Sequence, residues 1–281
     1  MGKILVTGSA GFLGKQIIQK LLDLNFSVVA LDKKKQIIKN KKVSIYKSNI
    51  VNFLKKNKLS KFDGIIHLAA ESRATFSYAK PLLFLRDNIM NLLYFLEAIK
   101  KCKKKPFFIF ASALDAQKKI ETSNPYLISK NTCEKIIKFY RLNYNIKCSV
   151  LVLSDLYSKK DVNSDRFLYK SIKLLKSNQT INITNKKHTF LFFDIENLTK
   201  SLADIINNFK KNSYFQVNCF SKERTNVVKL VRELKKITNS KSKIKISIPS
   251  NKLENIKPKI FTLGKQRKIS QNLKEIVKQF N

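Results

Sequence analysis

The sequence predicts an α/β protein with a doubly wound parallel sheet and a smaller C-terminal α+β lobe. Two observations predict it. In the first half of the chain, short apolar segments of strand length alternate with helical segments, which is typical of a sheet built from β-α-β units. The strand segments are nearly continuous runs of Ile, Val and Phe, as expected of strands that are covered on both faces.

Strands and helices alternate regularly as far as Leu153, and we expect the first domain to span residues 1–160. The expected elements are a strand at Lys3–Thr7, a helix at Phe12–Leu24, strands at Ser27–Asp32, Val43–Lys47 and Gly64–Ala69, a helix at Leu82–Lys100, a strand at Pro106–Ala111, a helix at Pro125–Tyr144 and a strand at Lys147–Leu153.

The pattern is looser after Leu153, and we expect residues 161–281 to form a smaller lobe that is interleaved with the first domain. The expected elements are a helix at Arg166–Ser177, short strands at Ile181–Thr184 and Phe190–Phe193, a helix at Ile195–Phe209, and the further segments Tyr214–Asn218, Asn226–Ile237, Ile244–Ile248 and Gln271–Phe280.

Composition excludes several classes of protein. The longest apolar run, Phe107–Leu114, is far shorter than the roughly 18–20 residues of a membrane-spanning helix. No signal-peptide pattern opens the chain. The four cysteines lie far apart and there are two histidines, so we expect buried thiols in a reducing compartment and no metal centre. These features predict a soluble, cytoplasmic protein.

The net charge of +38 comes mainly from lysine, since only seven of the 57 basic residues are arginine. Nucleic-acid readers favour arginine for bidentate contacts. The excess of Lys, Asn, Ile and Phe is also typical of an AT-rich genome. We therefore expect lysine-rich segments such as Lys33–Lys42 to be solvated loops, and polyanion binding to be the weaker reading.

Three of the six glycines occur together at Gly8, Gly11 and Gly14, between a predicted strand and a predicted helix. This is the context of a dinucleotide-binding turn of the Rossmann type. Gly8 permits the tight turn, Gly11 lets the backbone approach a pyrophosphate, and Gly14 lets the helix pack closely on the strand. The first helical residues, Phe12 and Leu13, would then offer their N–H groups to the phosphates.

Asp32 ends the second predicted strand, where a carboxylate can accept hydrogen bonds from the hydroxyls of an adenine ribose. It would repel a 2′-phosphate, which favours NAD over NADP. The three lysines that follow, Lys33, Lys34 and Lys35, could serve a 2′-phosphate, so NADP stays possible.

Tyr126 and Lys130 lie four residues apart at the start of a predicted helix, and therefore on one helix face. A nearby ammonium stabilises a phenolate and lowers the pKa of the tyrosine, so that it can exchange a proton with a sugar hydroxyl or ketone. The pair is common by chance, but it is specific after the fifth strand of a fold with this glycine motif.

With these motifs the chain resembles the extended short-chain dehydrogenase/reductases, the NAD-dependent epimerase/dehydratase group that acts on nucleotide sugars. The resemblance also includes His67-Leu68-Ala69-Ala70, Asn88, Phe190-Leu191-Phe192-Phe193-Asp194 and Leu263-Gly264. It implies that Tyr126 is the acid/base and that Lys130 also holds the nicotinamide ribose. It further implies that Leu68, Ala69 and Ala70 line the cofactor. We interpret His67 itself as a packed strand residue rather than a base.

The chain departs from this family near the reacting centre. Ala113 stands where the family has a catalytic Ser or Thr; Ser112 would replace it only if the strand end shifts, and Asp115 falls where some dehydratases have a catalytic Glu. After the third strand, Asn49 replaces the acidic residue of the family. The resemblance implies that Asn49 and Ile50 contact the adenine at this position.

Two substrate motifs also differ. The family's Asn-Val-Tyr-Gly-Pro has become Asp155-Leu156-Tyr157-Ser158-Lys159, and its diphosphate-binding Arg is replaced by His188. Lys186 and Lys187 are adjacent cations that could meet a diphosphate without the planar fork of an arginine.

The leading expectation is an NAD(P)-dependent enzyme, an oxidoreductase or isomerase, that moves a hydride at a carbon of a nucleotide sugar. Epimerase and 4-keto-sugar reductase rank equally, with dehydratase below them. The alternative is a non-catalytic dinucleotide-binding sensor or scaffold, and nucleic-acid binding is a weaker third. As in the resembled family, we expect a homodimer through a four-helix interface of the Leu82–Lys100 and Pro125–Tyr144 helices.

Overall fold

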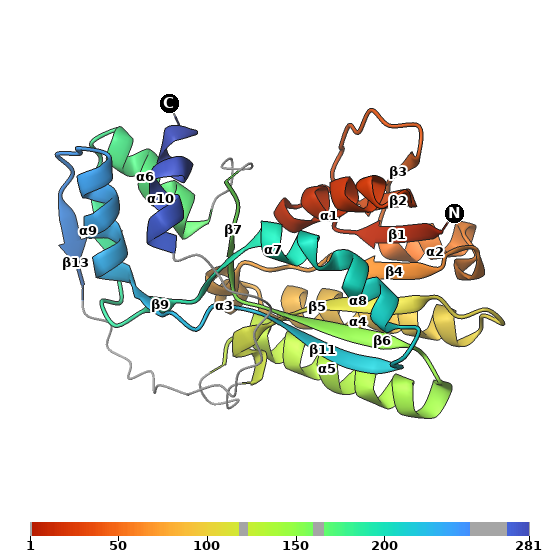
Figure 1. Ribbon diagram of the computed structural model, residues 1–281. Helices are drawn as coiled ribbons and strands as arrows, with labels where there is room; N and C mark the ends of the chain where they lie inside the picture. Colours follow the sequence, from red (N-terminus) through yellow and green to blue (C-terminus); the bar gives the residue numbers. More distant parts are fainter. Residues whose placement is uncertain (1, 118–122, 160–165, 248–268, 281) are drawn as a thin grey trace. The chain divides into compact units, whose positions relative to one another are not determined.

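The computed structural model describes residues 2–117, 123–159, 166–247 and 269–280 (Figure 1). The chain forms two compact units. The first comprises Met1–Leu153 and Leu198–Val217, and the second comprises Ser154–Asn197 and Asn218–Asn281. The Leu263-Gly264 pair named above lies outside the described residues. Among the described residues, no helix combines the length and the apolar character needed to cross a membrane.

The first unit contains a seven-stranded sheet with the strand order β11-β6-β5-β4-β1-β2-β3. The strands are β1 Lys3–Thr7, β2 Ser27–Asp32, β3 Val43–Lys47, β4 Gly64–His67, β5 Phe107–Ala113, β6 Cys148–Leu153 and β11 Tyr214–Cys219. All pairings from β3 through β6 are parallel. The predicted fold class is confirmed.

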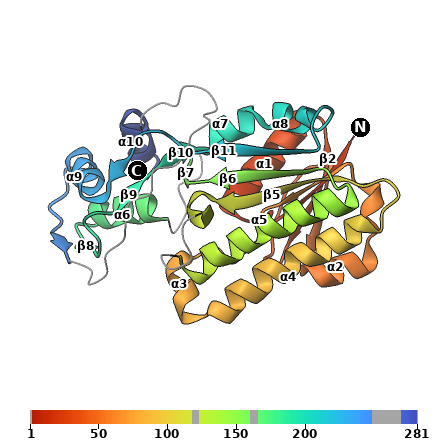
Figure 2. The ribbon, with the colours of Figure 1, turned by 90° about the horizontal axis from the view of Figure 1, so that it is seen from below.

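Helices cover both faces of this sheet. They are α1 Phe12–Asp23, α2 Ile50–Lys56, α3 Ala74–Ala79, α4 Pro81–Lys100, α5 Pro125–Tyr144 and α8 Leu202–Asn208, with short 3-10 turns at Leu59–Lys61 and Leu114–Gln117. Figure 2 shows α4 and α5 side by side on one face and α1 and α8 on the other. This double cover explains why β1, β2, β4 and β5 read as apolar runs.

The second unit consists of short elements. They are β7 Asp155–Tyr157, α6 Phe167–Lys176, β8 Ile181–Ile183, β9 Thr189–Phe190, β10 Phe192–Asp194, β12 Thr225–Asn226, α9 Val227–Ile237, β13 Ile244–Ile246 and α10 Ile269–Lys278, while α7 Ile195–Lys200 leads back to the first unit. The strands pair two by two: β7 with β10, β9 with β12, and β8 with β13. Apolar residues of α6 and α9 pack together as the core of this unit.

Three expectations for individual elements were wrong. The strand β3 is not buried on both faces: it is the last strand of the sheet, and Ile45 and Tyr46 are each 37% exposed. The single helix expected at Ile195–Phe209 is divided at Ser201 into α7 and α8, and the strand expected at Phe190–Phe193 is divided into β9 and β10.

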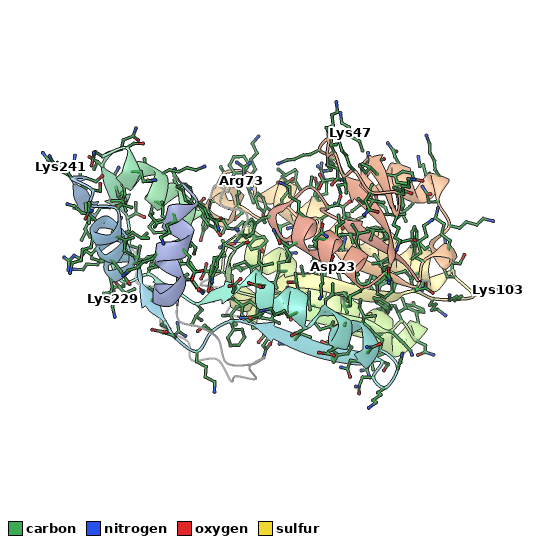
Figure 3. All side chains as sticks on the ribbon, turned by 45° about the horizontal axis from the view of Figure 1, so that its top comes forward. Asp23, Lys47, Arg73, Lys103, Lys229 and Lys241 are labelled. Carbon is green, nitrogen blue, oxygen red and sulfur yellow. The ribbon has the colours of Figure 1, made fainter. Side chains whose placement is uncertain are left out.

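The lysine-rich segments lie at the surface, as expected. The loop from Lys33 to Lys42 joins β2 directly to β3 without a helix, and its lysines are exposed. Figure 3 shows the side chains of Lys47, Lys103, Lys229 and Lys241 directed away from the ribbon. In the described part of the chain the charge is therefore distributed over loops and helix surfaces of both units.

Candidate active site

The carboxyl ends of β1 and β4 are adjacent at the point where the strand order reverses. β1 pairs with β2 on one side and with β4 on the other. In open α/β sheets, ligands bind in the crevice at such a switch point. The glycine loop follows β1 and the segment Leu68–Ala70 follows β4, so the structure brings these two predicted cofactor segments together.

The glycine loop has two positions where no side chain fits. Gly8 has φ +68°, and a Cβ there would lie 2.7 Å from the backbone nitrogen of Ala69. A Cβ at Gly14 would lie 2.3 Å from the carbonyl oxygen of Gly8. Both glycines are thus required by the backbone packing itself.

Gly11 is different, because it is exposed and a Cβ there would meet only the Gly8 oxygen, at 3.0 Å. Gly11 is also the N-cap of α1 and provides no side-chain cap for the first N–H groups of the helix. An open cradle at a helix N-terminus fits a pyrophosphate, so the residues present fit a dinucleotide.

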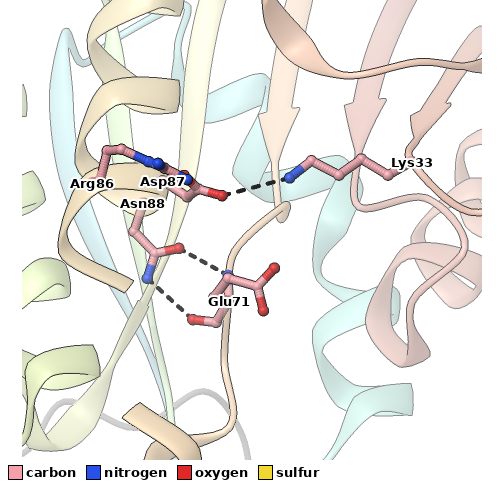
Figure 4. A network of polar contacts seen from close by, with 5 residues as sticks. All are labelled: Lys33, Glu71, Arg86, Asp87 and Asn88. Atoms are coloured by element: carbon pink, nitrogen blue, oxygen red, sulfur yellow. Dashed lines mark hydrogen bonds and ion pairs between the residues drawn. The ribbon is translucent and has the colours of Figure 1, made fainter. Parts of the chain in front are cut away.

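Asp32 is positioned at the end of β2 by two backbone hydrogen bonds. Its Oδ2 accepts from Ala10 N at 3.0 Å, and its Oδ1 accepts from Lys34 N at 2.8 Å. Each carboxylate oxygen retains a further lone pair with which it can accept a ribose hydroxyl. The Nζ of Lys33 lies 3.6 Å from Asp87 Oδ2 on α4 (Figure 4), which directs this lysine to a carboxylate.

Asn49 and Ile50 have structural roles at the start of α2. The Oδ1 of Asn49 accepts from Asn52 N at 2.8 Å and caps the helix, while Ile50 is 5% exposed and packs in the core. The side chain of Asn49 is exposed. The sequence did not reveal this capping role.

His67 is a packed residue, as interpreted from the sequence. It is 1% exposed, and its ring lies among Phe95, Phe108 and Phe110. Its Nδ1 is 2.8 Å from Thr7 Oγ1, which also accepts from Ala69 N at 3.2 Å. Burial and then the charge of Lys130 lower the pKa of His67 to about 3, so the imidazole is neutral at neutral pH.

Lys130 is held against the end of β5 by the first turns of α5. Asn124 caps this helix by accepting from Leu127 N at 3.0 Å. The Nζ of Lys130 donates to the carbonyl of Ala111 at 2.7 Å and lies 5.9 Å from the ring centroid of Tyr126. Burial lowers the pKa of Lys130 to about 8. The Tyr126–Lys130 pair of the sequence is thus a pair in space.

Asn88 connects the cofactor segment after β4 to the helix that carries Tyr126. Its Oδ1 accepts from Glu71 N at 2.8 Å and its Nδ2 donates to Glu71 O at 3.1 Å (Figure 4). The same amide nitrogen donates to Ser129 Oγ at 2.9 Å, and Ser129 Oγ donates to Tyr126 O at 2.7 Å. Four hydrogen bonds therefore fix the backbone of Tyr126 relative to the loop after β4.

The end of β5 gives the three remaining candidates different surroundings. Ser112 is 2% exposed, and its hydroxyl donates to the carboxylate of Glu134 on α5. Ala113 is half-buried and has no hydroxyl. Asp115 lies two residues further, in the 3-10 turn Leu114–Gln117, and is exposed. Glu134 was missed in the sequence, although its spacing of four residues from Lys130 marks the same helix face.

The substrate motifs lie in the second unit. Asp155 accepts from Leu191 N at 3.1 Å, and the backbone of Ser158 exchanges hydrogen bonds with the hydroxyl of Tyr169. His188 is exposed and packs edge-on against Phe190, with the two ring centroids 4.6 Å apart.

An arginine that sequence reasoning missed contacts the residue that follows this histidine. Arg224 Nη1 is 3.5 Å from Thr189 Oγ1, because β12 pairs antiparallel with β9. The distance of 35 residues along the chain hid this proximity. In the described residues, no group of three or more His, Cys, Asp or Glu side chains is arranged to hold a metal ion.

Comparisons with known proteins agree with these motifs. Residues 4–213 match the model of the NAD dependent epimerase/dehydratase family. A dTDP-D-glucose 4,6-dehydratase of Dictyostelium discoideum is 28% identical over 233 residues, which are 68% of this chain and 53% of that protein. The chain thus spans about half the length of the curated relatives it matches.

Solved structures with the same fold cover almost the whole chain. A UDP-glucose 4-epimerase of Thermotoga maritima, solved with UDP-glucose, superposes with a TM-score of 0.82 at 22% identity and covers 99% of this chain and 98% of its own. A UDP-glucuronic acid 4-epimerase of Bacillus cereus, solved with UDP-glucuronic acid and NAD, has a TM-score of 0.82 at 23% identity and covers 99% and 100%.

Proposed function

Because the chain belongs to the NAD dependent epimerase/dehydratase family, we propose that it is an NAD-dependent enzyme that acts on a nucleotide-linked sugar. The observation that carries the proposal is the buried Lys130 beside Tyr126, in the same unit as the open glycine cradle. NAD, when bound, supplies the hydride acceptor or donor. Relatives named as epimerases and dehydratases of nucleotide sugars support the substrate class.

Tyr126 is the proposed acid/base for a sugar hydroxyl or ketone. The ammonium of Lys130, 5.9 Å from its ring centroid, stabilises the phenolate form. Lys130 must be protonated for this task, so we expect activity to fall as the pH rises through about 8. Asp32 binds the adenine ribose, and Gly11, Phe12 and Leu13 bind the pyrophosphate.

The reaction we propose is either epimerisation or reduction of a 4-keto sugar. Both require hydride transfer at a sugar carbon with a single acid/base, which Tyr126 provides. A 4,6-dehydratase needs further acid and base groups beside the sugar. Leu114 replaces one of the acidic pair of the glucose dehydratases, and Asp115 retains the other position, so dehydration ranks third.

We also propose that the basic side chains around β9 and β12 bind the diphosphate of the substrate. Arg224, Lys186, Lys187 and His188 are all exposed side chains of this part of the second unit. The guanidinium of Arg224 supplies the planar fork that the sequence motif lacks at His188. The contact of Arg224 with Thr189 supports this assignment because Thr189 directly follows His188 in the chain.

A second candidate function is a dinucleotide-binding sensor without catalysis. One observation favours it: the hydroxyl of Ser112 is directed to Glu134, and Ala113 has none to offer a substrate oxygen. Both functions require cofactor binding, but only the enzyme converts a sugar substrate.

The discriminating experiment is a turnover assay with nucleotide sugars and 4-keto sugars, together with analysis of the copurifying cofactor. Tightly held NAD with interconversion of epimers supports epimerase; exchangeable NADPH with reduction supports reductase. Binding of NAD without turnover of any of the sugars by the wild type, Tyr126→Phe or Ala113→Ser would favour the sensor.

A homodimer through α4 and α5 is part of the proposal. Leu82 and Leu142 are 70% and 71% exposed, and Met90, Tyr94 and Phe139 add further apolar surface on the same two helices. A second copy would cover this surface as a four-helix interface. Sedimentation should give a dimer at micromolar concentration, and a Leu82→Glu/Leu142→Glu variant should give a monomer. A wild-type monomer would contradict the proposal.

The proposed location is the cytoplasm. All four cysteines are free thiols, and Cys133, Cys148 and Cys219 are buried. Free thiols are the state expected in a reducing compartment.

A further inference from the structure

Glu134 is a buried carboxylate that the proposed chemistry does not use. It is 7% exposed and lies on α5 one helical turn after Lys130, so both side chains face the same side of the helix. The hydroxyl of Ser112 on β5 donates to its Oε1. A single hydroxyl does not compensate the loss of hydration of a buried carboxylate, so a nearby positive charge is needed.

Lys130 is a buried ammonium and likewise needs a nearby charge of opposite sign. It is 4% exposed, its Nζ donates to the Ala111 carbonyl at 2.7 Å, and the same atom lies 4.6 Å from the ring centroid of Phe110. A carbonyl and an aromatic face are neutral groups. Glu134 is the carboxylate that shares its helix face.

Consecutive residues of β5 hold the two charges. Ala111 binds Lys130 through its backbone carbonyl, and Ser112 binds Glu134 through its side chain. One strand therefore fixes two successive turns of α5. Each charged group thus has its own hydrogen-bond partner on β5, which leaves Lys130 available to Tyr126.

We propose that Glu134 is a positioning residue of the active site, oriented by Ser112 so that its negative charge keeps Lys130 in the ammonium form at neutral pH. The inference rests on the proposed function, in which the ammonium stabilises the phenolate of Tyr126. It gives Ser112 a role in orienting Glu134 in place of one at the substrate.

The other groups that face Lys130 do not supply this charge. On α5, burial raises the pKa of Cys133 to about 12, so its thiol is neutral. From β4, His67 is also neutral, since burial lowers its pKa to about 3. Burial lowers the pKa of Lys130, and the charge of Glu134 acts in the opposite direction.

The group that faces Glu134 from β11 is Tyr214. Burial raises the pKa of Tyr214, and the charge of Glu134 raises it further. Tyr214 is therefore a neutral phenol at neutral pH. A cation also acts on Tyr214: Arg141, two turns after Glu134 on α5, has its guanidinium carbon 5.3 Å from the Tyr214 ring centroid. Lys130 is the buried cation, one turn before Glu134 on the same helix.

The test is the titration of Lys130 in the chain without cofactor. Glu134→Gln keeps an oxygen that can accept from Ser112 and removes the charge. We expect the titration midpoint of Lys130 to fall by about one pH unit or more, as for loss of a nearby opposite charge. The measurement is NMR of protein labelled with ¹³C at lysine Cε, with the Lys130 resonance assigned by its loss in Lys130→Met.

Glu97→Gln is the matched control. Glu97 on α4 also accepts from a hydroxyl, Tyr140 Oη at 2.5 Å, but Tyr140 lies ten residues beyond Lys130, about 15 Å along α5. We expect the Lys130 midpoint to be unchanged in this variant. The same shift in both variants would overturn the proposal, as would an unchanged midpoint in Glu134→Gln.

If Glu134→Gln does not fold, the proposal is tested by the NMR signal of Glu134 in the wild-type protein. The Cδ resonance of Glu134 must be that of an ionised carboxylate at neutral pH, and the resonance of a neutral acid would overturn the proposal. Both readouts are independent of turnover, so a chain that binds NAD but converts no sugar can still pass them. In an active enzyme, the alkaline limb of kcat/KM should move to lower pH with the Lys130 midpoint.

Discussion

The two units of the molecule differ in what their motif residues do. In the first unit, the glycine loop, Asp32 and Lys130 are each held by hydrogen bonds or close packing of the unit itself, and still have groups available for a ligand. In the second unit, the motif at Asp155–Lys159 is tied internally by hydrogen bonds to Leu191 and Tyr169. Its remaining ligand candidates are exposed cations such as Arg224.

This difference separates two kinds of information. A dinucleotide is the same molecule in every enzyme that uses it, and it constrains the first unit through backbone geometry. The second unit must fit a particular sugar nucleotide, and this substrate specificity depends on individual side chains. We therefore expect changes in the first unit to affect binding of the cofactor or the chemical step, and changes in the second to affect the substrate KM.

The largest effect is expected for Tyr126→Phe. The phenol is the proposed acid/base, and such a group contributes about 10²–10⁴-fold to the rate. We expect kcat to fall by this amount while NAD affinity, measured by calorimetry, changes little. Tyr144→Phe on the same helix is the control, since Tyr144 packs against Tyr140 and Lys100. Full activity of Tyr126→Phe would remove the tyrosine from the mechanism.

The glycine loop offers a contrast within the first unit. At Gly11 a Cβ would lie 3.0 Å from the Gly8 carbonyl oxygen, a tight contact, whereas at Gly14 it would lie 2.3 Å from the same oxygen, where no side chain fits. Gly11→Val should therefore fold with a modest loss of melting temperature and, because its side chain fills the cradle, lose NAD binding more than 100-fold, roughly the value of several charge-assisted hydrogen bonds. Gly14→Ala should lower the melting temperature much more. Unchanged NAD affinity in Gly11→Val would contradict the assignment.

Much of the first unit could be predicted because its signals are local. The apolar runs of β1 and β2, the glycines between β1 and α1, and the spacing of Tyr126 and Lys130 are all visible within a few residues. The exposure of β3 could not be predicted in this way, because strand order depends on pairing with distant segments. An edge strand with Ile45 and Tyr46 has the same local pattern as a central one.

The remaining failures have the same origin. Nothing near Ser112 in the sequence indicates that its hydroxyl binds Glu134, which lies 22 residues away on a packed helix. Arg224 is brought to Thr189 only by the pairing of β9 with β12. Contacts between separate elements decide what a polar side chain does, and these contacts are set by tertiary packing.

The smallest effect is expected in the second unit, for Arg224→Gln. The guanidinium is the proposed planar contact to the substrate diphosphate, and a hydrogen bond to a charged group contributes about 1.5–3 kcal/mol. Arg224 is exposed, and Lys186 and Lys187 lie nearby, so we expect the loss of binding free energy to be at the lower end of this range. It corresponds to about a tenfold rise in KM for a nucleotide sugar. We expect kcat and NAD affinity to be unchanged, because neither depends on this contact.

Arg232→Gln is the control for this variant, since Arg232 is an exposed arginine of the same unit on α9. Removing either arginine lowers the net charge equally, so a general electrostatic attraction of the anionic substrate would raise KM in both variants alike. A rise confined to Arg224→Gln, and lost when a sugar without the nucleotide diphosphate is the substrate, identifies a direct contact. A change in kcat without a change in KM would instead show that Arg224 acts in the chemical step. It would contradict the expectation that changes in the second unit affect only the substrate KM.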